Sequence, residues 1–103
     1  MDRFDHNRPL VYLAAPLFSE AELHFNLALT TRIEASLDVY LTQRDGGKLV
    51  DLLASGVEEH AAYKSIFDRD LRALEAACAL IIVLDGRAID EGAAFELGYA
   101  YAH

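Results

Sequence analysis

In the segment DEGAAFELGYAYAH (90–103), one of the three acids, Glu96, has an unusual setting. On a helix, its neighbours in space are the residues three and four positions away. None of them is charged: Gly92, Ala93, Tyr99 and Ala100. A solvated surface glutamate is the alternative, but the pattern favours a carboxylate that lines a pocket near a helix N-terminus, where the helix dipole helps to keep it ionised. Such a group could act as a covalent nucleophile or stabilise a cation.

Other polar side chains could share this pocket. Asp90 would lie on the loop that roofs it, or would cap the last helix, since Asp is a preferred N-cap residue. Asp68 and Asp70 are two positions apart on a predicted helix, so one can face the edge of the sheet and the other water, and periodicity does not choose between them. Tyr12 lies in a predicted buried strand, so its hydroxyl needs a partner, which could be a pocket carboxylate or the backbone.

Two further sets of residues could bind a ligand or a metal. The segment QRDGG (43–47) is either a plain turn or a loop that offers Gln43 and Asp45 to a polar ligand. The histidines show no metal-binding spacing, so we predict no metal site. They are His6, His24, His60 and His103. The sequence has no GxGxxG after its first strand, no P-loop and no GxSxG, so dinucleotide, nucleoside triphosphate and serine hydrolase chemistry lack their key residues.

Composition narrows the class of protein. The chain has 103 residues, 53% of them hydrophobic, which predicts one globular domain over residues 1–103. Its net charge of −8 and lack of a basic run argue against a nucleic acid polymer as ligand. The longest apolar run, 76–84, is far shorter than the roughly 20 residues that a membrane helix needs, so no membrane partner is expected. With no signal peptide pattern and a lone Cys78, we expect a cytoplasmic protein.

Three strands are predicted to position these residues. LVYLAA (10–15) reads as a buried strand, and DVYLT (38–42) as a shorter one. ALIIVLD (79–85) is apolar throughout, which predicts a central strand in a sheet covered on both faces.

Helices are predicted between these strands. Ser19 and Glu22 form a capping-box pattern at the start of a helix over 19–37. Its apolar face is predicted from six residues: Leu23, Phe25, Leu27, Leu29, Ile33 and Leu37. KLVDLL (48–53) suggests one helical turn, 58–77 a second long helix, and AAFELGYAYA (93–102) a third.

The alternation of strands and helices predicts the fold class. It indicates a Rossmann-like or flavodoxin-like α/β fold, with three αβα layers and a parallel sheet. Ligands of such sheets bind at the carboxyl ends of the strands, which points to the loops 14–20, 42–50 and 85–92. Three strands would leave much apolar surface bare, so we expect the natural chain to continue beyond His103 and a partner subunit to cover part of that surface.

Three quoted segments together resemble the nucleoside 2-deoxyribosyltransferases, from about residue 10 to the end. They are VYLAAPLFSEAELHFN, IFDRDLRALEAACALIIVLDG and DEGAAFELGYAYA. The resemblance rests on their combination: a tyrosine in the first strand, the acid of DxDL before the predicted central strand, and D-x-G-x-x-x-E-L-G-Y-A.

The resemblance implies a role for several residues. Glu96 matches the nucleophile that attacks C1′ of the deoxyribose, and Tyr12 matches the tyrosine that orients it. Asp70 matches the acid that handles the proton of the departing and incoming base. Asp90 and, more loosely, Gln43 match substrate-binding residues, and Gly92 belongs to the same motif. The family also uses residues near its C-terminus, some from a neighbouring subunit, and this sequence lacks that segment.

The implied activity is base exchange on 2′-deoxynucleosides through a covalent deoxyribosyl-glutamate. It needs no cofactor, and its ligands are a 2′-deoxynucleoside and a free nucleobase. The resemblance also implies a homo-oligomer with sites shared between subunits, and a place in nucleotide salvage and deoxyribonucleoside catabolism. Two alternatives stay open: an N-glycosidase that hydrolyses deoxynucleosides or their 5′-monophosphates, and a nucleoside-binding module without chemistry. The loop AAPLFSEAE (14–22) carries two acids and no Arg or Gly, which favours a free nucleoside over a monophosphate.

Overall fold

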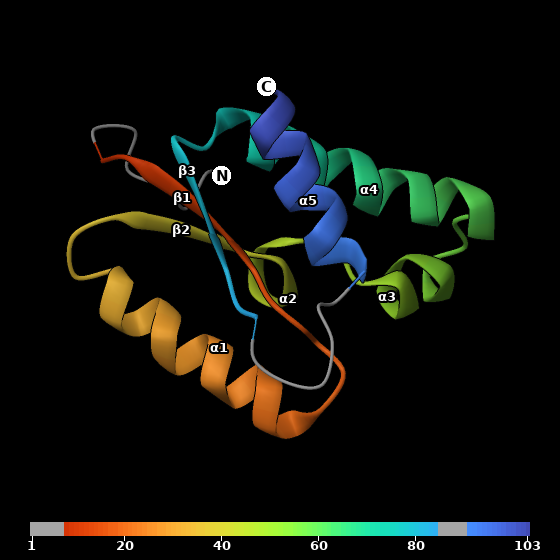
Figure 1. The fold of residues 1–103 in the computed structure, drawn as a ribbon. Helices are drawn as coiled ribbons and strands as arrows, with labels where there is room; N and C mark the ends of the chain where they lie inside the picture. The colour runs from red at the N-terminus through yellow and green to blue at the C-terminus, as the bar shows by residue number, and fades with distance from the viewer. Residues whose placement is uncertain (1–7, 85–90) are drawn as a thin grey trace.

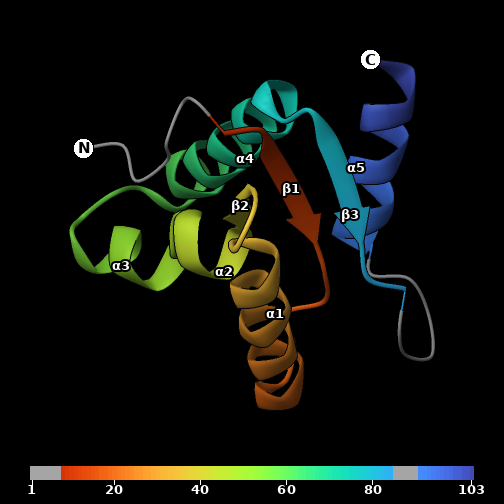
Figure 2. The same cartoon turned by 90° about the vertical axis from the view of Figure 1, so that its left-hand side faces the viewer.

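A three-stranded parallel sheet forms the centre of the molecule. The computed structural model describes residues 8–84 and 91–103. The strands are β1 (Leu10–Ala14), β2 (Asp38–Leu41) and β3 (Ala79–Ile82), and they are ordered β2-β1-β3. Helices lie on both faces, with α1 (Glu20–Ile33) on one side and α4 (Glu59–Ala76) and α5 (Glu91–Ala102) on the other (Figures 1 and 2). The predicted α/β fold is therefore confirmed.

The alternation of side chains along the strands gives the sheet two apolar faces. Tyr12 and Tyr40 are paired in register on neighbouring strands and point to the face that α4 and α5 cover. Leu13, Val39 and Leu41 point to the opposite face, where α1 packs. All five side chains are buried. The two tyrosine side chains therefore lie on the face of the sheet that is covered by the helices with the candidate acids.

The order of the strands corrects one prediction. The sequence predicted that 79–85 is the central strand, but β1 holds the central position and β3 pairs with β1 alone in the described residues. The backbone of Val83 still donates to Ala14, just past the end of β3. Residues 85–90 lie outside the described residues. The prediction was wrong because an unbroken apolar run reports that helices cover both faces of a strand, not that both of its edges are paired.

Helix α1 (Glu20–Ile33) starts as the sequence predicts. The Ser19 hydroxyl accepts from the Glu22 backbone N–H at 3.2 Å, and the Glu22 carboxylate accepts from the Ser19 backbone N–H at 2.8 Å. This reciprocal capping box satisfies donors that the first turn would otherwise leave unpaired.

Replacing Ser19 with Ala should lower the free energy of unfolding by about 1 kcal/mol, because it removes half of this cap. Denaturant titration followed by circular dichroism measures the change. Ser65→Ala is a matched control, since Ser65 is exposed in the interior of a helix, where Ala is the better helix former. Equal losses in the two variants would contradict the capping role.

The buried face of α1 differs from the predicted one. Phe25 and Leu27 are 51% and 43% exposed, whereas Asn26 and Thr30 are buried. The Asn26 amide donates to the Pro16 carbonyl and to the Gln43 side chain, both at 3.0 Å. Burial of a polar amide is tolerated because its hydrogen bonds are made, and apolar periodicity cannot detect such a residue.

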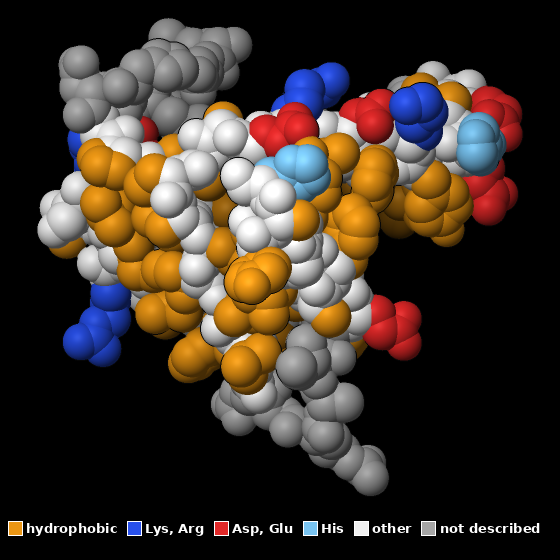
Figure 3. Space-filling view, turned by 45° about the horizontal axis from the view of Figure 1, so that its top comes forward, with side chains coloured by type: hydrophobic (Ala, Val, Ile, Leu, Met, Phe, Trp, Pro, Cys, Tyr) orange, Lys and Arg blue, Asp and Glu red, His pale blue; other side chains and the backbone are white. Residues whose placement is uncertain are grey.

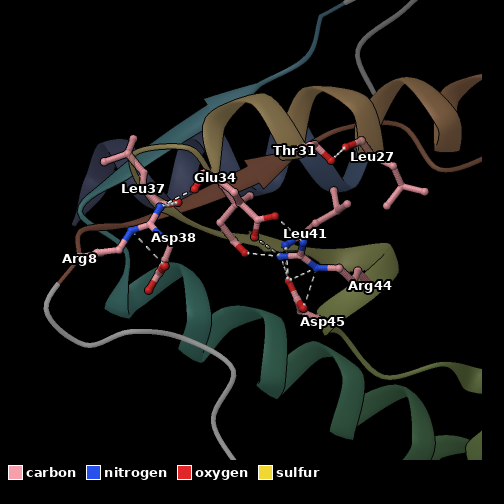
Figure 4. Close-up of polar contacts among 10 residues, drawn as sticks. Arg8, Leu27, Thr31, Glu34, Leu37, Asp38, Leu41, Arg44 and Asp45 are labelled. Atoms are coloured by element: carbon pink, nitrogen blue, oxygen red, sulfur yellow. Dashed lines mark hydrogen bonds and ion pairs between the residues drawn. The ribbon is translucent and has the colours of Figure 1, made fainter.

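Two short helices follow β2. The segment predicted as a loop holds α2 (Thr42–Asp45), and the predicted helical turn is α3 (Leu49–Ala54). The guanidinium of Arg44 holds α2 in place: it contacts the carboxylates of Glu34 and Asp45, and donates to the Val39 carbonyl at 2.8 Å (Figure 4). A helix of four residues has too few internal hydrogen bonds to be predicted from periodicity, and tertiary contacts decide its formation.

The two remaining helices, α4 (Glu59–Ala76) and α5 (Glu91–Ala102), cover the tyrosine face of the sheet. In the described residues, no helix has the length and apolar character needed to cross a membrane. Hydrophobic side chains make up much of the face drawn in Figure 3. The most exposed large ones on α5 are Phe95 at 50% and Tyr101 at 93%. Bare apolar surface was predicted for a three-stranded sheet.

Candidate active site

A tyrosine and a glutamate meet across the interface of β1 and α5. Glu96 lies in the second turn of α5, and its Oε2 accepts a short hydrogen bond from the hydroxyl of Tyr12. Tyr12 is fully buried, and Glu96 is half-buried. Burial, together with the bond to Glu96 and its charge, raises the pKa of Tyr12. Tyr12 therefore stays protonated and keeps donating to the carboxylate.

A second tyrosine and carboxylate lie beside the first pair. The hydroxyl of Tyr40, on β2, donates to Oδ1 of Asp70, on α4, at 2.7 Å. Burial raises the pKa of Asp70, although the bond from Tyr40 and the charge of Arg69 act in the opposite direction. A carboxyl group with a raised pKa can hold a proton for general acid catalysis.

Only one of the two acids Asp68 and Asp70 faces the sheet. Asp70 faces Tyr40 and the sheet, whereas Asp68 pairs with Lys64 at 2.9 Å on the outer side of α4. Residues two apart on a helix point in different directions, so only one of the two could face the sheet.

The two tyrosine–carboxylate pairs are in direct contact through their rings. The ring centroids of Tyr12 and Tyr40 are 5.3 Å apart and the planes differ by 20°, which is a stacked arrangement. This contact follows from the strand register, because Tyr12 and Tyr40 are directly opposite each other in the sheet.

A cavity of about 290 Å³ opens between α4 and α5. Both candidate acids, Asp70 and Glu96, line it, and so does Gly92 from the predicted motif. Aromatic and aliphatic side chains form the rest of its wall: Tyr63, Ile66, Phe67, Leu71, Leu74 and Phe95. An apolar pocket with a few convergent polar groups is the usual form of a small-molecule site.

Gln43 and Asp45 are not among the residues that line this cavity. The Gln43 amide accepts from Asn26 and donates to the Leu23 carbonyl, both at 3.0 Å, so it ties α1 to α2. The Asp45 carboxylate accepts from the Leu41 backbone and contacts Arg44. Gln43 as a base-contacting residue stays a prediction. Asp90 lies outside the described residues.

Two residues of the site were not predicted. Tyr40 could have been found from its place in the second strand, had the register with Tyr12 been known. Gly46 approaches the same carboxyl: a Cβ built there would be 2.9 Å from Asp70 Oδ1 and 2.7 Å from the Thr42 carbonyl oxygen. Any side chain at this position would require the backbone or Asp70 to move. Sequence alone gives no signal for that approach.

Fold and site together define an α/β protein in which two buried tyrosines each hold a partly buried carboxylate, and both carboxylates line one cavity. The chain belongs to the nucleoside 2-deoxyribosyltransferase family, whose sequence model matches residues 11–103. No curated protein shows significant similarity to the chain. Membership implies a transferase of the glycosyltransferase type that acts on small nucleosides.

Proposed function

We propose that the protein exchanges the base of 2′-deoxynucleosides, with Glu96 as nucleophile and Asp70 as general acid and base. The observation that carries the proposal is the presence of both carboxyl groups on one cavity, each held by a buried tyrosine. A module that only binds nucleosides needs neither a nucleophile nor an acid with a raised pKa.

In the first step, a carboxylate oxygen of Glu96 attacks C1′ of the deoxyribose. The bond between C1′ and the base nitrogen breaks, its electron pair leaves with the base, and Asp70 gives its proton to the base. The transition state resembles an oxocarbenium ion, which a carboxylate beneath C1′ stabilises before it forms the covalent ester.

In the second step, an incoming base attacks C1′ from the face that the first base left. Asp70, now ionised, takes the proton from the attacking nitrogen, and the ester bond to Glu96 breaks. Two displacements at C1′ give net retention of configuration, as in retaining glycosidases. Water in place of the base would give hydrolysis.

The surroundings of each acid support its role. Glu96 accepts a hydrogen bond from Tyr12, and a donor of this kind stabilises the carboxylate that a nucleophile requires. Asp70 lies where burial favours the protonated form that a general acid requires. An acid with a raised pKa beside a carboxylate held as an acceptor is the pattern of an acid and nucleophile pair.

The N-terminus of α1 supports a free nucleoside as substrate. The Glu22 carboxylate already accepts from the backbone N–H groups of Phe18 and Ser19, at 3.0 and 2.8 Å. Helix N-termini bind phosphate groups through backbone N–H donors of this kind. Here a carboxylate already occupies the donors, and its negative charge repels a phosphate. This contact disfavours the alternative in which the substrate is a deoxynucleoside 5′-monophosphate.

Base cleavage should fall as pH rises through the pKa of Asp70. Asp70 is protonated below its folded pKa and can donate, and it loses that proton above it. Because burial raises this pKa, the alkaline limb of kcat/KM should lie above the ordinary range for Asp. A pH–rate profile measures the position of this alkaline limb. Asp68→Asn is the control and should leave that position unchanged. A rate that does not decline on the alkaline side would contradict the acid role.

The function itself is tested by incubating the protein with a deoxynucleoside, with and without a second free base, and separating the products. A new deoxynucleoside supports the transferase, whereas free base and deoxyribose alone identify the hydrolase. No turnover would leave the binding module as the better account.

The cytoplasmic location, the shared-site homo-oligomer and the role in salvage stay predictions.

A further inference from the structure

Tyr40 has no part in the mechanism above, although it contacts one of its acids. Tyr40 is 4% exposed, and its hydroxyl donates to Oδ1 of Asp70 at 2.7 Å. We propose that Tyr40 is a positioning residue for the transfer reaction: it fixes the Asp70 carboxyl so that the other oxygen, Oδ2, carries the proton to and from the base. The inference rests on the proposed function, since it assigns Tyr40 to the acid of that mechanism.

Oδ1 of Asp70 has a hydrogen-bond donor on one side and little free space on another. Tyr40 donates to Oδ1, and the backbone of Gly46 approaches so closely that a Cβ there would be 2.9 Å from the same oxygen. Because Oδ1 already accepts a hydrogen bond, the acidic proton belongs on Oδ2. A general acid works only within hydrogen-bond reach of its target, so a fixed orientation increases the rate.

Tyr40 is itself rigidly placed. It is paired in register with Tyr12 across two neighbouring strands, and the two rings stack. Tyr12 holds Glu96 as Tyr40 holds Asp70. The stacked tyrosines therefore set the position of the nucleophile relative to the acid, with each carboxyl coming from a different helix.

Tyr40 also influences the charge of Asp70. Among the described residues, titratable groups close to that carboxyl or to the Tyr40 hydroxyl come from five elements. They are Tyr12 on β1, Tyr40 on β2, Asp45 on α2, Tyr63 and Arg69 on α4, and Glu96 on α5. Of these, Tyr40 and Arg69 lower the pKa of Asp70 against the effect of burial. Without the Tyr40 hydroxyl, the ionised form loses a donor, and the pKa of Asp70 rises further.

Tyr40→Phe removes the hydroxyl and keeps the ring stack. The alkaline limb of kcat/KM should move to higher pH by about one unit, which is the size expected for loss of a hydrogen bond to a charged group. At the optimum, kcat should fall roughly tenfold, with a smaller change in KM, because orientation of the acid affects the chemical step. NMR titration of the Asp70 carboxyl should move in the same direction. Tyr101→Phe is the control, because this tyrosine is 93% exposed on α5.

Replacing Tyr40 with 3-fluorotyrosine gives a test of opposite sign. The fluorinated phenol is a stronger hydrogen-bond donor of nearly the same shape, so it stabilises the ionised carboxylate more. The alkaline limb of kcat/KM and the NMR titration of Asp70 should therefore both move to lower pH. General damage to the fold cannot produce shifts of opposite sign, and this variant also serves if Tyr40→Phe fails to fold.

Two results are decisive. If neither replacement moves the Asp70 titration, Tyr40 does not control this carboxyl, and the inference is overturned. If the titration moves but the pH–rate limb does not, the contact of Tyr40 with Asp70 stands and the acid role of Asp70 in the proposed function is the part that fails.

Discussion

Replacing Glu96 with Gln should reduce base exchange by about four to six orders of magnitude, the loss seen when a covalent nucleophile is removed. Gln keeps an oxygen that can accept from Tyr12, so the buried hydroxyl retains a partner. An amide cannot form the ester with C1′. The fold and the binding of a deoxynucleoside should therefore persist, and rates from product chromatography can be compared with affinities from calorimetry.

Glu96→Ala should lose activity to the same extent, but it should also lower the free energy of unfolding by about 1–3 kcal/mol, because it leaves the Tyr12 hydroxyl buried and unpaired. The difference between the two variants separates chemistry from stability. Glu59→Gln, at an exposed glutamate on α4, is the control and should retain full activity. Normal rates in Glu96→Gln would refute the assignment of the nucleophile.

Replacing Asp70 with Asn should lower kcat for natural deoxynucleosides by roughly 10²–10⁴-fold, the usual contribution of general acid catalysis. Asn still accepts a hydrogen bond from Tyr40 but has no proton to give at neutral pH. The defect should depend on the leaving group. A deoxyriboside whose leaving group departs as a stable anion needs no proton, so the variant should cleave it at close to the normal rate.

Comparison of the two substrates on the same variant is the sharp form of this test. Asp68→Asn, which changes the acid paired with Lys64 two positions away, should cleave both substrates normally. An Asp70→Asn enzyme that is equally slow with both would show that Asp70 contributes to binding or to stability, and not to proton transfer.

Local patterns predicted most of the fold. The capping box at Ser19 and Glu22 was confirmed, and the three strands were placed within a few residues of β1, β2 and β3. These features are local, because they depend on residue types within one turn or one strand. The central position of β1 is not local, and neither is the burial of Asn26 on α1, since both depend on which elements pair across the sheet.

The candidate site shows the same division. Glu96 was notable from its uncharged helical neighbours alone, and the need of Tyr12 for a partner followed from its strand. Periodicity did not choose between Asp70 and Asp68, although the family resemblance indicated Asp70, and the orientation of α4 accounts for that choice. Tyr40 required the register of β1 with β2, and Gly46 required the approach of the end of α2 to Asp70. Contacts between distant segments are set by packing, and no spacing in a single sequence encodes them.

Mass spectrometry of the protein, quenched rapidly after mixing with a deoxynucleoside in the absence of an acceptor base, shows directly whether Glu96 forms a covalent intermediate. We expect a mass increase of one deoxyribosyl group, located on the peptide that contains Glu96 and lost when a free base is added before the quench. Turnover in which no adduct forms, or an adduct on another residue, would contradict it.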